Sequence, residues 1–259
     1  VVRGKGSGRL PVVMTAEEVW RVTERRDGPC RLAALLMYGS GLRLMETLTL
    51  RVKDVDFSAR EILVRGGKGN KDRRTMLPES LVGELTMQLA RARKQFERDV
   101  SRGVANVDLP DGVARKYPNA SREWGWQWVF PASRVYRTKE GVVRRHHLHE
   151  SVMQRAMADA VKGAGLTKRA SCHTFRHSFA TQLIQAGYDI RTVQELLGHS
   201  DVRTTMIYVH VLNKGGLGVR SPADMLAVPI PASSSALHTR PARPQVQRRQ
   251  ADRLDGGRS

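Results

Sequence analysis

Apolar residues at helical spacing, interrupted once by a glycine-rich segment, most constrain the fold of this 259-residue chain. In the interrupting segment, residues 52–78, aliphatic and β-branched residues surround a cluster of turn-forming glycines, which predicts a small antiparallel sheet with a hairpin. Lys68 lies at the tip of that hairpin. The helical spacing recurs in residues 79–102, 147–164, 174–186 and 190–197. The sequence therefore predicts an α+β fold that is mostly α.

The N-terminal third predicts short helices separated by glycines. Thr15 and Glu18 form a capping box, so a helix should begin there and run towards Gly28. Pro29 can open a second helix, and residues 42–50 suit a short third one. At the other end of the domain, Gly198 should cap the helix 190–197, and a last short helix should include TTMIYVHV.

The chain is strongly basic: 44 Lys and Arg stand against 25 Asp and Glu, a formal net charge of +19. Such an excess implies a polyanionic partner, either nucleic acid or an acidic membrane surface. The basic residues are spread over the whole length rather than gathered on one amphipathic helix, which favours nucleic acid. No stretch approaches the ~20 apolar residues of a membrane span, and no signal-peptide core is present, so we expect a cytoplasmic protein.

Composition also marks the ends of the domain. Residues 1–11 are basic and glycine-rich and are typical of a linker. Residues 229–259 are rich in Pro, Ser and Arg, which predicts a disordered basic tail. The two cysteines, Cys30 and Cys172, are too few for a disulfide framework or a thiolate metal cluster.

Several residues are suited to cleaving a phosphodiester with a protein hydroxyl. That reaction needs a nucleophile, donors for the non-bridging oxygens, and an acid for the leaving oxygen. Arg43 and Arg176 could grip the phosphate through their guanidinium forks, and His173 shares a helix face with Arg176. Lys68 could protonate the departing 5′ oxygen. His199 could add a hydrogen bond, and the candidate nucleophile, Tyr208, follows nine residues later.

Each of these residues has an ordinary structural interpretation as well. A lone Arg is usually a solvated surface charge, and a lone His is usually packed in a core. A Lys in a glycine-rich hairpin is commonly a turn residue, and a Tyr in an apolar helix is by default a core aromatic. The series in this order is far more specific than its members.

The series resembles the active site of tyrosine recombinases. The matching residues are Arg43 in GLR, Lys68 in GKGNKDR, His173 and Arg176 in HTFR, His199 in LLGH, and Tyr208. The resemblance covers about residues 12–226, and it places the catalytic domain at residues 12–228. It implies a mostly helical catalytic domain with a small antiparallel sheet, the DNA breaking-rejoining fold. It also implies a 3′-phosphotyrosyl intermediate and no cofactor, since the covalent bond conserves the energy of the broken one.

Within that family the resemblance implies a role for each matched residue. Arg43 and Arg176 hold the phosphate, and His173 and His199 donate hydrogen bonds and handle protons. Lys68 is the general acid and Tyr208 the nucleophile. Two further residues support the site: Glu46, which orients it, and His177, which neighbours it. Full-length members carry an N-terminal DNA-binding domain, from which residues 1–11 would be the linker, and form a homotetramer in the synaptic complex.

A finer resemblance is to the integron integrases. ARKYPNA, WGWQWVFPAS, VVRRHHLHESVMQRAM and VLNKGGLGVRSPADML carry it, and residues 103–145 correspond to the insertion of that subfamily. Its members recombine gene cassettes and bind a folded single strand as well as duplex sites. Exposed aromatic and imidazole planes can stack on unpaired bases. The DNA-binding candidates are Trp124, Trp126, Trp128, Arg144, Arg145, His146 and His147. We expect one or two of the tryptophans to be buried and the other aromatic and histidine rings to face DNA.

Other functions stay open on sequence alone. The chain could be a phage or chromosome-dimer type of recombinase acting on duplex sites, or a DNA-binding remnant that no longer recombines. A type IB topoisomerase shares the nucleophile chemistry, but the RHH and GVRSPADML matches argue against it. A zinc site is another alternative, because His173 and His177 have the i, i+4 spacing of helical ligands, but HExxH and paired CxxC motifs are lacking. The sequence therefore predicts no metal.

Overall fold

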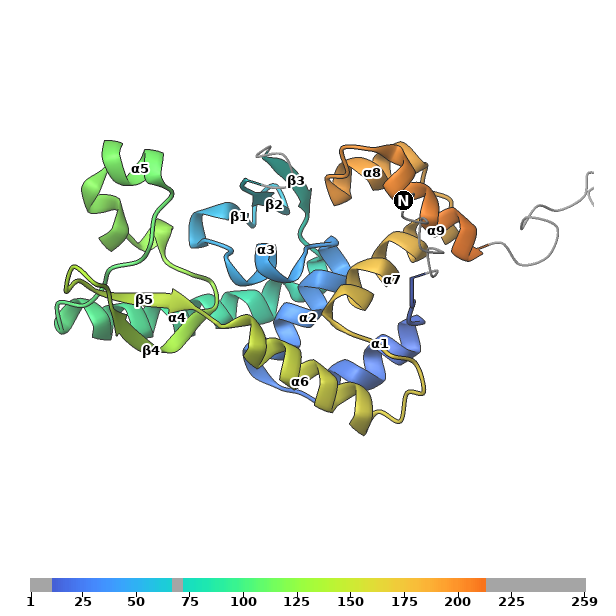
Figure 1. The fold of residues 1–259 in the computed structure, drawn as a ribbon, viewed down its shortest axis with the longest axis horizontal. Coiled ribbons are helices and arrows are strands. Elements are labelled where there is room, and N and C mark those ends of the chain that lie inside the picture. Colours follow the sequence, from blue (N-terminus) through green and yellow to red (C-terminus); the bar gives the residue numbers. More distant parts are fainter. Residues whose placement is uncertain (1–10, 67–71, 213–259) are drawn as a thin grey trace, which may run out of the picture. The chain divides into compact units, whose positions relative to one another are not determined.

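The computed structural model describes residues 11–66 and 72–212, and within them the chain is mostly helical (Figure 1). The α-helices in chain order are α1 (Ala16–Thr23), α2 (Gly28–Ser40), α3 (Leu44–Leu48), α4 (Val82–Ser101), α5 (Asp111–Lys116), α6 (Glu150–Gly163), α7 (Cys172–Gln185), α8 (Ile190–Leu197) and α9 (Val202–Leu212). Short 3-10 turns lie at η1 (Val52–Asp54), η2 (Glu79–Leu81), η3 (Pro118–Arg122) and η4 (Trp124–Trp126). The predicted mostly α, α+β fold is confirmed.

Two small antiparallel sheets complete the fold. Strands β1 (Val55–Asp56), β2 (Glu61–Val64) and β3 (Arg73–Met76) pair in that order, with Ile62 opposite both Val55 and Thr75. The small antiparallel sheet predicted for this segment is confirmed. Ile62 and Thr75 are buried, so this face of the sheet covers the core. The predicted hairpin tip with Lys68 lies outside the described residues. Strands β4 (Pro131–Arg137) and β5 (Val143–His147) form the second sheet.

The N-terminal helices begin at the predicted caps. The Thr15 hydroxyl accepts from the amide of Glu18, and the Glu18 carboxylate accepts from the amide of Thr15, which closes the capping box. Helix α1 ends at Thr23, earlier than predicted. Helix α2 ends at Ser40, and its C-cap, Gly41, has a left-handed φ of +64°. A Cβ there would lie 2.5 Å from Cε1 of Phe179 on α7, so glycine allows α2 and α7 to approach.

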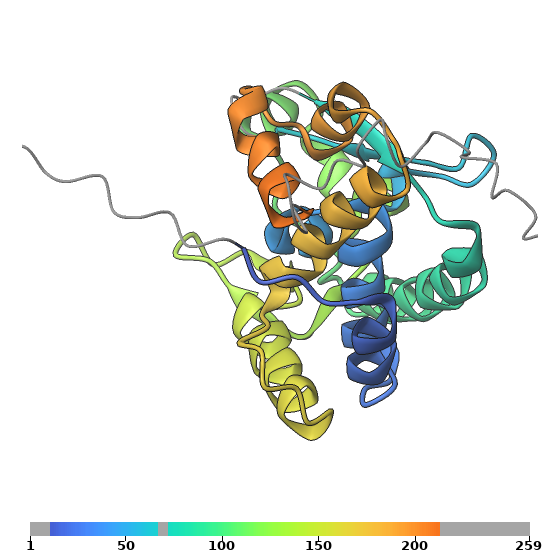
Figure 2. The same cartoon turned by 90° about the vertical axis from the view of Figure 1, so that its right-hand side faces the viewer.

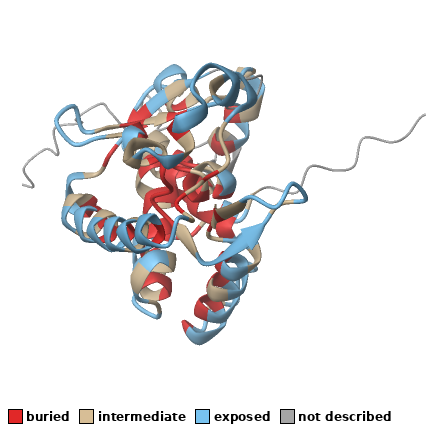
Figure 3. Cartoon of the chain, turned by 90° about the vertical axis from the view of Figure 1, so that its left-hand side faces the viewer, coloured by how far each residue is buried: buried red, intermediate tan, exposed pale blue. Residues whose placement is uncertain are grey.

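Helix α2 lies at the centre of the main core. Its residues Leu36 and Met37 are fully buried, and α2 packs against α1, α4, α6 and α7. Figure 2 shows α7, α8 and α9 (gold to orange) on one side of the blue α2. Phe179, Val193 and Tyr208 join these three helices in a second, smaller cluster. In Figure 3 the buried residues gather where the helices meet.

Residues 103–145, predicted without regular structure, contain α5 and most of the β4–β5 sheet. The helix predicted from residue 147 instead begins at Glu150, because Leu148 donates to the Phe130 carbonyl (2.7 Å) and so extends the β5 edge. The His149 ring then caps α6 by accepting from the amide of Ser151 (3.2 Å). A strand and its cap thus occupy the start of the predicted helical segment.

Arg145 of β5 anchors this insertion to α4. Its guanidinium donates to both oxygens of Asp99 and to the Ala132 carbonyl, and its own carbonyl accepts from the Trp128 indole (3.0 Å). The side chains of Arg145 and Asp99 are 7% and 4% exposed. The prediction that Arg145 contacts DNA phosphate is therefore wrong in this structure, because its guanidinium is buried and already paired.

Removing one partner of this pair should destabilise the domain strongly. Arg145→Ala leaves the Asp99 carboxylate buried without its counter-charge, a change that costs about 3–5 kcal/mol. The neighbouring Arg144→Ala is the matched control. Arg144 pairs with Asp108, and both side chains are more than a third exposed, so its loss should cost about 1 kcal/mol or less. Urea unfolding measures both values, and equal losses would show that the buried pair does not anchor the insertion.

Candidate active site

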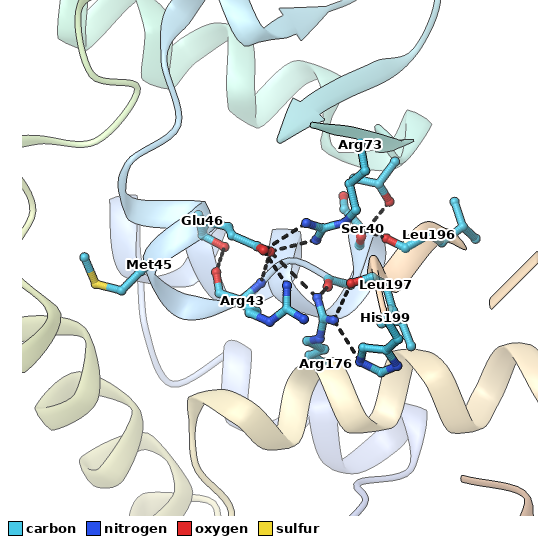
Figure 4. Close-up of polar contacts among 12 residues, drawn as sticks. Ser40, Arg43, Met45, Glu46, Arg73, Arg176, Leu196, Leu197 and His199 are labelled. Carbon is cyan, nitrogen blue, oxygen red and sulfur yellow. Dashed lines mark hydrogen bonds and ion pairs between the residues drawn. The ribbon is translucent and has the colours of Figure 1, made fainter. Parts of the chain in front are cut away.

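The carboxylate of Glu46 lies at the centre of the candidate site (Figure 4). It accepts from the amide of Arg43 (2.8 Å) and from the Arg43 guanidinium (2.6 Å). Arg73 binds it with both terminal nitrogens, at 2.8 and 2.7 Å, and Arg176 lies 3.7 Å away. Burial by itself raises the pKa of Glu46, but the hydrogen bonds and charge of Arg73, together with the hydrogen bonds from Arg43, lower it to about 2. Glu46 is thus a fixed negative charge among three arginines.

Arg176 of α7 is a buried cation, with its side chain 5% exposed. It donates to the carbonyl of Gly41 and to the carbonyl of Leu197 (2.5 Å), and one nitrogen lies 3.2 Å from Nε2 of His199. Burial and the nearby charge of Arg43 lower its pKa to about 9, against the opposing effect of Glu46. Since the cationic form is disfavoured here, a bound anion such as a phosphate would stabilise it.

Arg43 is the more accessible of the two predicted phosphate ligands, with 28% of its side chain exposed. Its position just before α3 follows from Gly41, where α2 ends, and from the bond between the Arg43 amide and Glu46. Glu46 therefore holds the backbone and the side chain of Arg43 together. The structure brings Arg43, Arg176, Glu46 and His199 into one network, as the sequence predicted.

Tyr208 lies next to this network, on α9. Its ring stacks on that of His199 at 6.4 Å between centroids, and its hydroxyl lies 3.0 Å from Nδ1 of His177. His199 also contacts the Thr205 hydroxyl at 2.9 Å, which fixes the imidazole on α9. Tyr208 is only 2% exposed, and burial raises the pKa of its hydroxyl although Arg176 and Arg43 act in the opposite sense.

His177 is suited to accept the hydrogen bond of Tyr208. Burial, together with the charges of His173 and Arg176, lowers the pKa of His177 to about 4, so its ring is neutral near pH 7. His173 itself is exposed at the start of α7. Lys68 belongs to residues 67–71, outside the described part of the chain.

Arg73 is the site residue that sequence reasoning missed. It opens β3, its side chain is 9% exposed, and besides Glu46 it bonds the carbonyl of Leu196 (3.0 Å). It follows the predicted hairpin directly and stands beside Arg74, which faces Glu61. Only the register of β3 distinguishes the two arginines.

The predicted DNA-binding residues of the insertion lie in different environments. Trp124 and Trp126 are half-buried, with Arg93 and Lys53 over their rings, whereas Trp128 is 5% exposed beneath Arg51. Arg144 is paired with Asp108.

The paired histidines also differ. His146 is half-buried, whereas His147 is 7% exposed and packs edge-on against Trp128 at 5.3 Å. Burial lowers the pKa of His147. The expectation that His147 faces DNA is therefore wrong here, because Trp128 and the strand cover its ring.

A cavity of about 430 Å³ lies between the insertion and the first sheet. Its lining includes Met45, Asp54, Arg65, Asp108, Trp126 and Trp128. Met45 lies next to Glu46, so this cavity borders the arginine network.

Within 11–66 and 72–212, no three His, Cys, Asp or Glu side chains gather as a metal site would require. In the same ranges, every helix is too short or too polar to cross a bilayer.

The chain is similar to known recombinases. It matches the phage integrase family over residues 13–214. An Escherichia coli protein named integrase/recombinase is 56% identical over 226 residues, which are 86% of this chain and 67% of that protein. The tyrosine recombinase XerD of Agrobacterium fabrum is 35% identical over 219 residues, 79% of this chain and 60% of that one. The chain thus spans about two thirds of the length of these relatives.

Solved structures show the same fold. The XerA recombinase superposes with a TM-score of 0.53 at 27% identity, over 79% of this chain and 62% of that chain. The XerH recombinase bound to its palindromic difH substrate superposes with a TM-score of 0.55 at 24% identity, over 81% of this chain and 52% of that chain. The predicted catalytic-domain fold and the family resemblance are both confirmed. The chain belongs to the phage integrase family of tyrosine recombinases.

Proposed function

We propose that this chain cleaves and rejoins DNA strands through a covalent bond between Tyr208 and a 3′ phosphate. The observation that carries this proposal is the network in which Arg43 and Arg176 share Glu46, and His199 joins Arg176 to the ring of Tyr208. Two guanidinium groups beside a tyrosine hydroxyl suit transfer of a phosphoryl group whose charge grows in the transition state. The net charge of +19 supports a DNA partner.

In the proposed reaction, the Tyr208 oxygen attacks the phosphorus and the bond to the 5′ oxygen breaks. Lys68 gives a proton to that leaving oxygen, and the proton of Tyr208 passes to a neighbouring base or to water. Arg43, Arg176, His173 and His199 hold the non-bridging oxygens. Attack by a 5′ hydroxyl then reverses these steps and rejoins a strand, so no external energy source is needed. As in the family, four copies would assemble on two DNA sites.

Tyr208 must move before it can attack, because a side chain that is 2% exposed cannot contact a DNA backbone. This movement breaks the hydrogen bond between the Tyr208 hydroxyl and His177. Tyr208 lies on α9, whose contacts are with α7 and α8, so a shift of this helix would suffice.

We further propose an integron-integrase type of substrate, with gene cassettes carried on a folded strand. The cavity beside Glu46 supports this, since about 430 Å³ lined by Trp126, Trp128 and polar side chains suits one unpaired base. His146 and Trp124, also half-buried, are further candidates for stacking. The alternative is that the chain acts on duplex sites alone. The similarity to the recombinases XerD and XerA supports this alternative. An inactive remnant is a third possibility, and adduct formation distinguishes it.

Tyr208→Phe should abolish covalent chemistry. The probe is a library of nicked duplexes with a randomised centre, in which cleavage releases a short strand and traps the adduct. Tyr38→Phe is the matched control, because it also removes a partly buried hydroxyl that contacts α7, at Gln182. We expect adducts from the wild type and from the control, and none from Tyr208→Phe on denaturing gels. An undiminished yield from Tyr208→Phe would place the nucleophile elsewhere.

Trp126→Ala should weaken binding to an unpaired base selectively. A stacked base contributes ~1–3 kcal/mol, and only when it is extrahelical. Competition binding compares a hairpin that has one unpaired base with the same sequence fully paired, at one salt concentration. Trp20→Ala is the control, since Trp20 is 60% exposed on α1. Equal losses on both substrates would restrict Trp126 to a role in the fold and would favour the duplex alternative.

A further inference from the structure

We propose that Arg73 is a positioning residue for DNA cleavage, which orients Glu46 and, through it, the two phosphate-binding arginines. The inference rests on the proposed function, because the orientation of Arg43 and Arg176 matters only if they hold a phosphate. Arg73 itself is not proposed to contact DNA. Its side chain is 9% exposed, and all three of its guanidinium nitrogens donate to protein oxygens.

The geometry of the Arg73 contacts fixes the Glu46 carboxylate. Two parallel hydrogen bonds, at 2.8 and 2.7 Å, match the planar fork of a guanidinium to both carboxylate oxygens. Of the three arginines around Glu46, Arg73 alone among the described contacts binds both oxygens with its side chain. Arg73 on β3 therefore fixes the plane of the Glu46 carboxylate. That plane in turn determines how the carboxylate oxygens meet the amide and the guanidinium of Arg43.

Arg73 also fixes the turn that presents His199. Its Nε donates to the carbonyl of Leu196, while Arg176 donates to the next carbonyl, that of Leu197. Successive carbonyls at the end of α8 are thus bound by two arginines that also surround Glu46. The Arg73 side chain passes directly under Gly198: a Cβ at this residue, whose φ is +62°, would lie 2.5 Å from the Arg73 Cδ.

Arginine is required at this position for its shape as well as its charge. A lysine could keep a positive charge near Glu46, but it has one nitrogen and cannot bind two carboxylate oxygens in plane while also reaching Leu196. Arg73→Lys therefore retains the net charge and tests geometry. Arg74→Lys is the matched control, since Arg74 is the next residue of β3 and its guanidinium pairs with Glu61 on an exposed edge.

The experiment measures single-turnover adduct formation at saturating protein, on a nicked duplex that the wild-type chain captures from the randomised library. Arg73→Lys should slow cleavage on the order of 10- to 100-fold, as misplaced catalytic groups do. DNA affinity should change less than twofold, and Arg74→Lys should match the wild type. Thermal unfolding shows that each variant is folded at the assay temperature.

Two further measurements separate positioning from a general structural role. In a Glu46→Gln background, Arg73→Lys should add much less than its defect in the wild-type background, because two of the three Arg73 hydrogen bonds act through the Glu46 carboxylate. On a methylphosphonate substrate, where one non-bridging oxygen is replaced by a methyl group, the wild-type to Arg73→Lys ratio should shrink, since less charge develops for the arginines to stabilise.

The outcomes are distinguishable. Additive defects, or the same ratio on both substrates, would overturn the positioning role of Arg73 and leave the proposed function intact. Cleavage by Arg73→Lys at the wild-type rate would also overturn the positioning role of Arg73 and leave the proposed function intact. If the wild type and the Arg74→Lys control both failed to form an adduct with any captured or randomised duplex, the proposed function itself would be wrong.

Discussion

A buried carboxylate shared by arginines is the interaction on which the site depends. Glu46 would be costly to bury alone, and Arg176 would be costly to bury as a lone cation. Together with Arg43 and Arg73 they leave an excess of positive charge around one carboxylate. The network thus forms without DNA. Its three arginines still carry more positive charge than the single Glu46 carboxylate neutralises. In the proposed function a DNA phosphate would supply the missing negative charge, which would connect the folding of the domain to its chemistry.

The fold serves this network by bringing three arginines to the Glu46 carboxylate and the end of α8 to two of those arginines. Arg43 precedes α3, Arg73 opens β3, Arg176 lies on α7, and the end of α8 supplies the carbonyls of Leu196 and Leu197. The close approach of α2 and α7 at Gly41, and the packing of β3 against α8, set the distances. Tyr208 reaches the network from α9 through the ring of His199. Long-range packing, rather than any local motif, therefore makes the site.

Sequence reasoning named the residues of the network that lie in motifs and missed Arg73, whose position depends on a strand register. The GLR, HTFRH and LLGH motifs led to Arg43, Arg176 and His199 without any structure. Arg73 could not be told from Arg74 among 44 Lys and Arg, because only the pairing of β2 with β3 decides which faces Glu46.

The same physics explains the errors in the insertion. In β5 the alternation of a strand buries Arg145 and His147 and leaves Arg144 and His146 partly accessible. Because no strand was predicted here, the sequence alone could not tell which of these four basic residues would be buried and which would be accessible. The glycine and capping signals, by contrast, act locally, so the predicted starts of α1 and α2 and the end of α8 are confirmed.

Glu46 is held ionised by its arginines in the absence of DNA, and titration of its carboxyl group measures this directly. Carbon-detected NMR of the side-chain carboxyl, assigned with Glu46→Gln, follows the group as the pH falls. With a pKa of about 2, Glu46 should stay ionised through pH ~4, where ordinary glutamates are roughly half protonated. Titration of Glu46 together with the exposed glutamates would contradict the account, because the arginines would then not hold its charge.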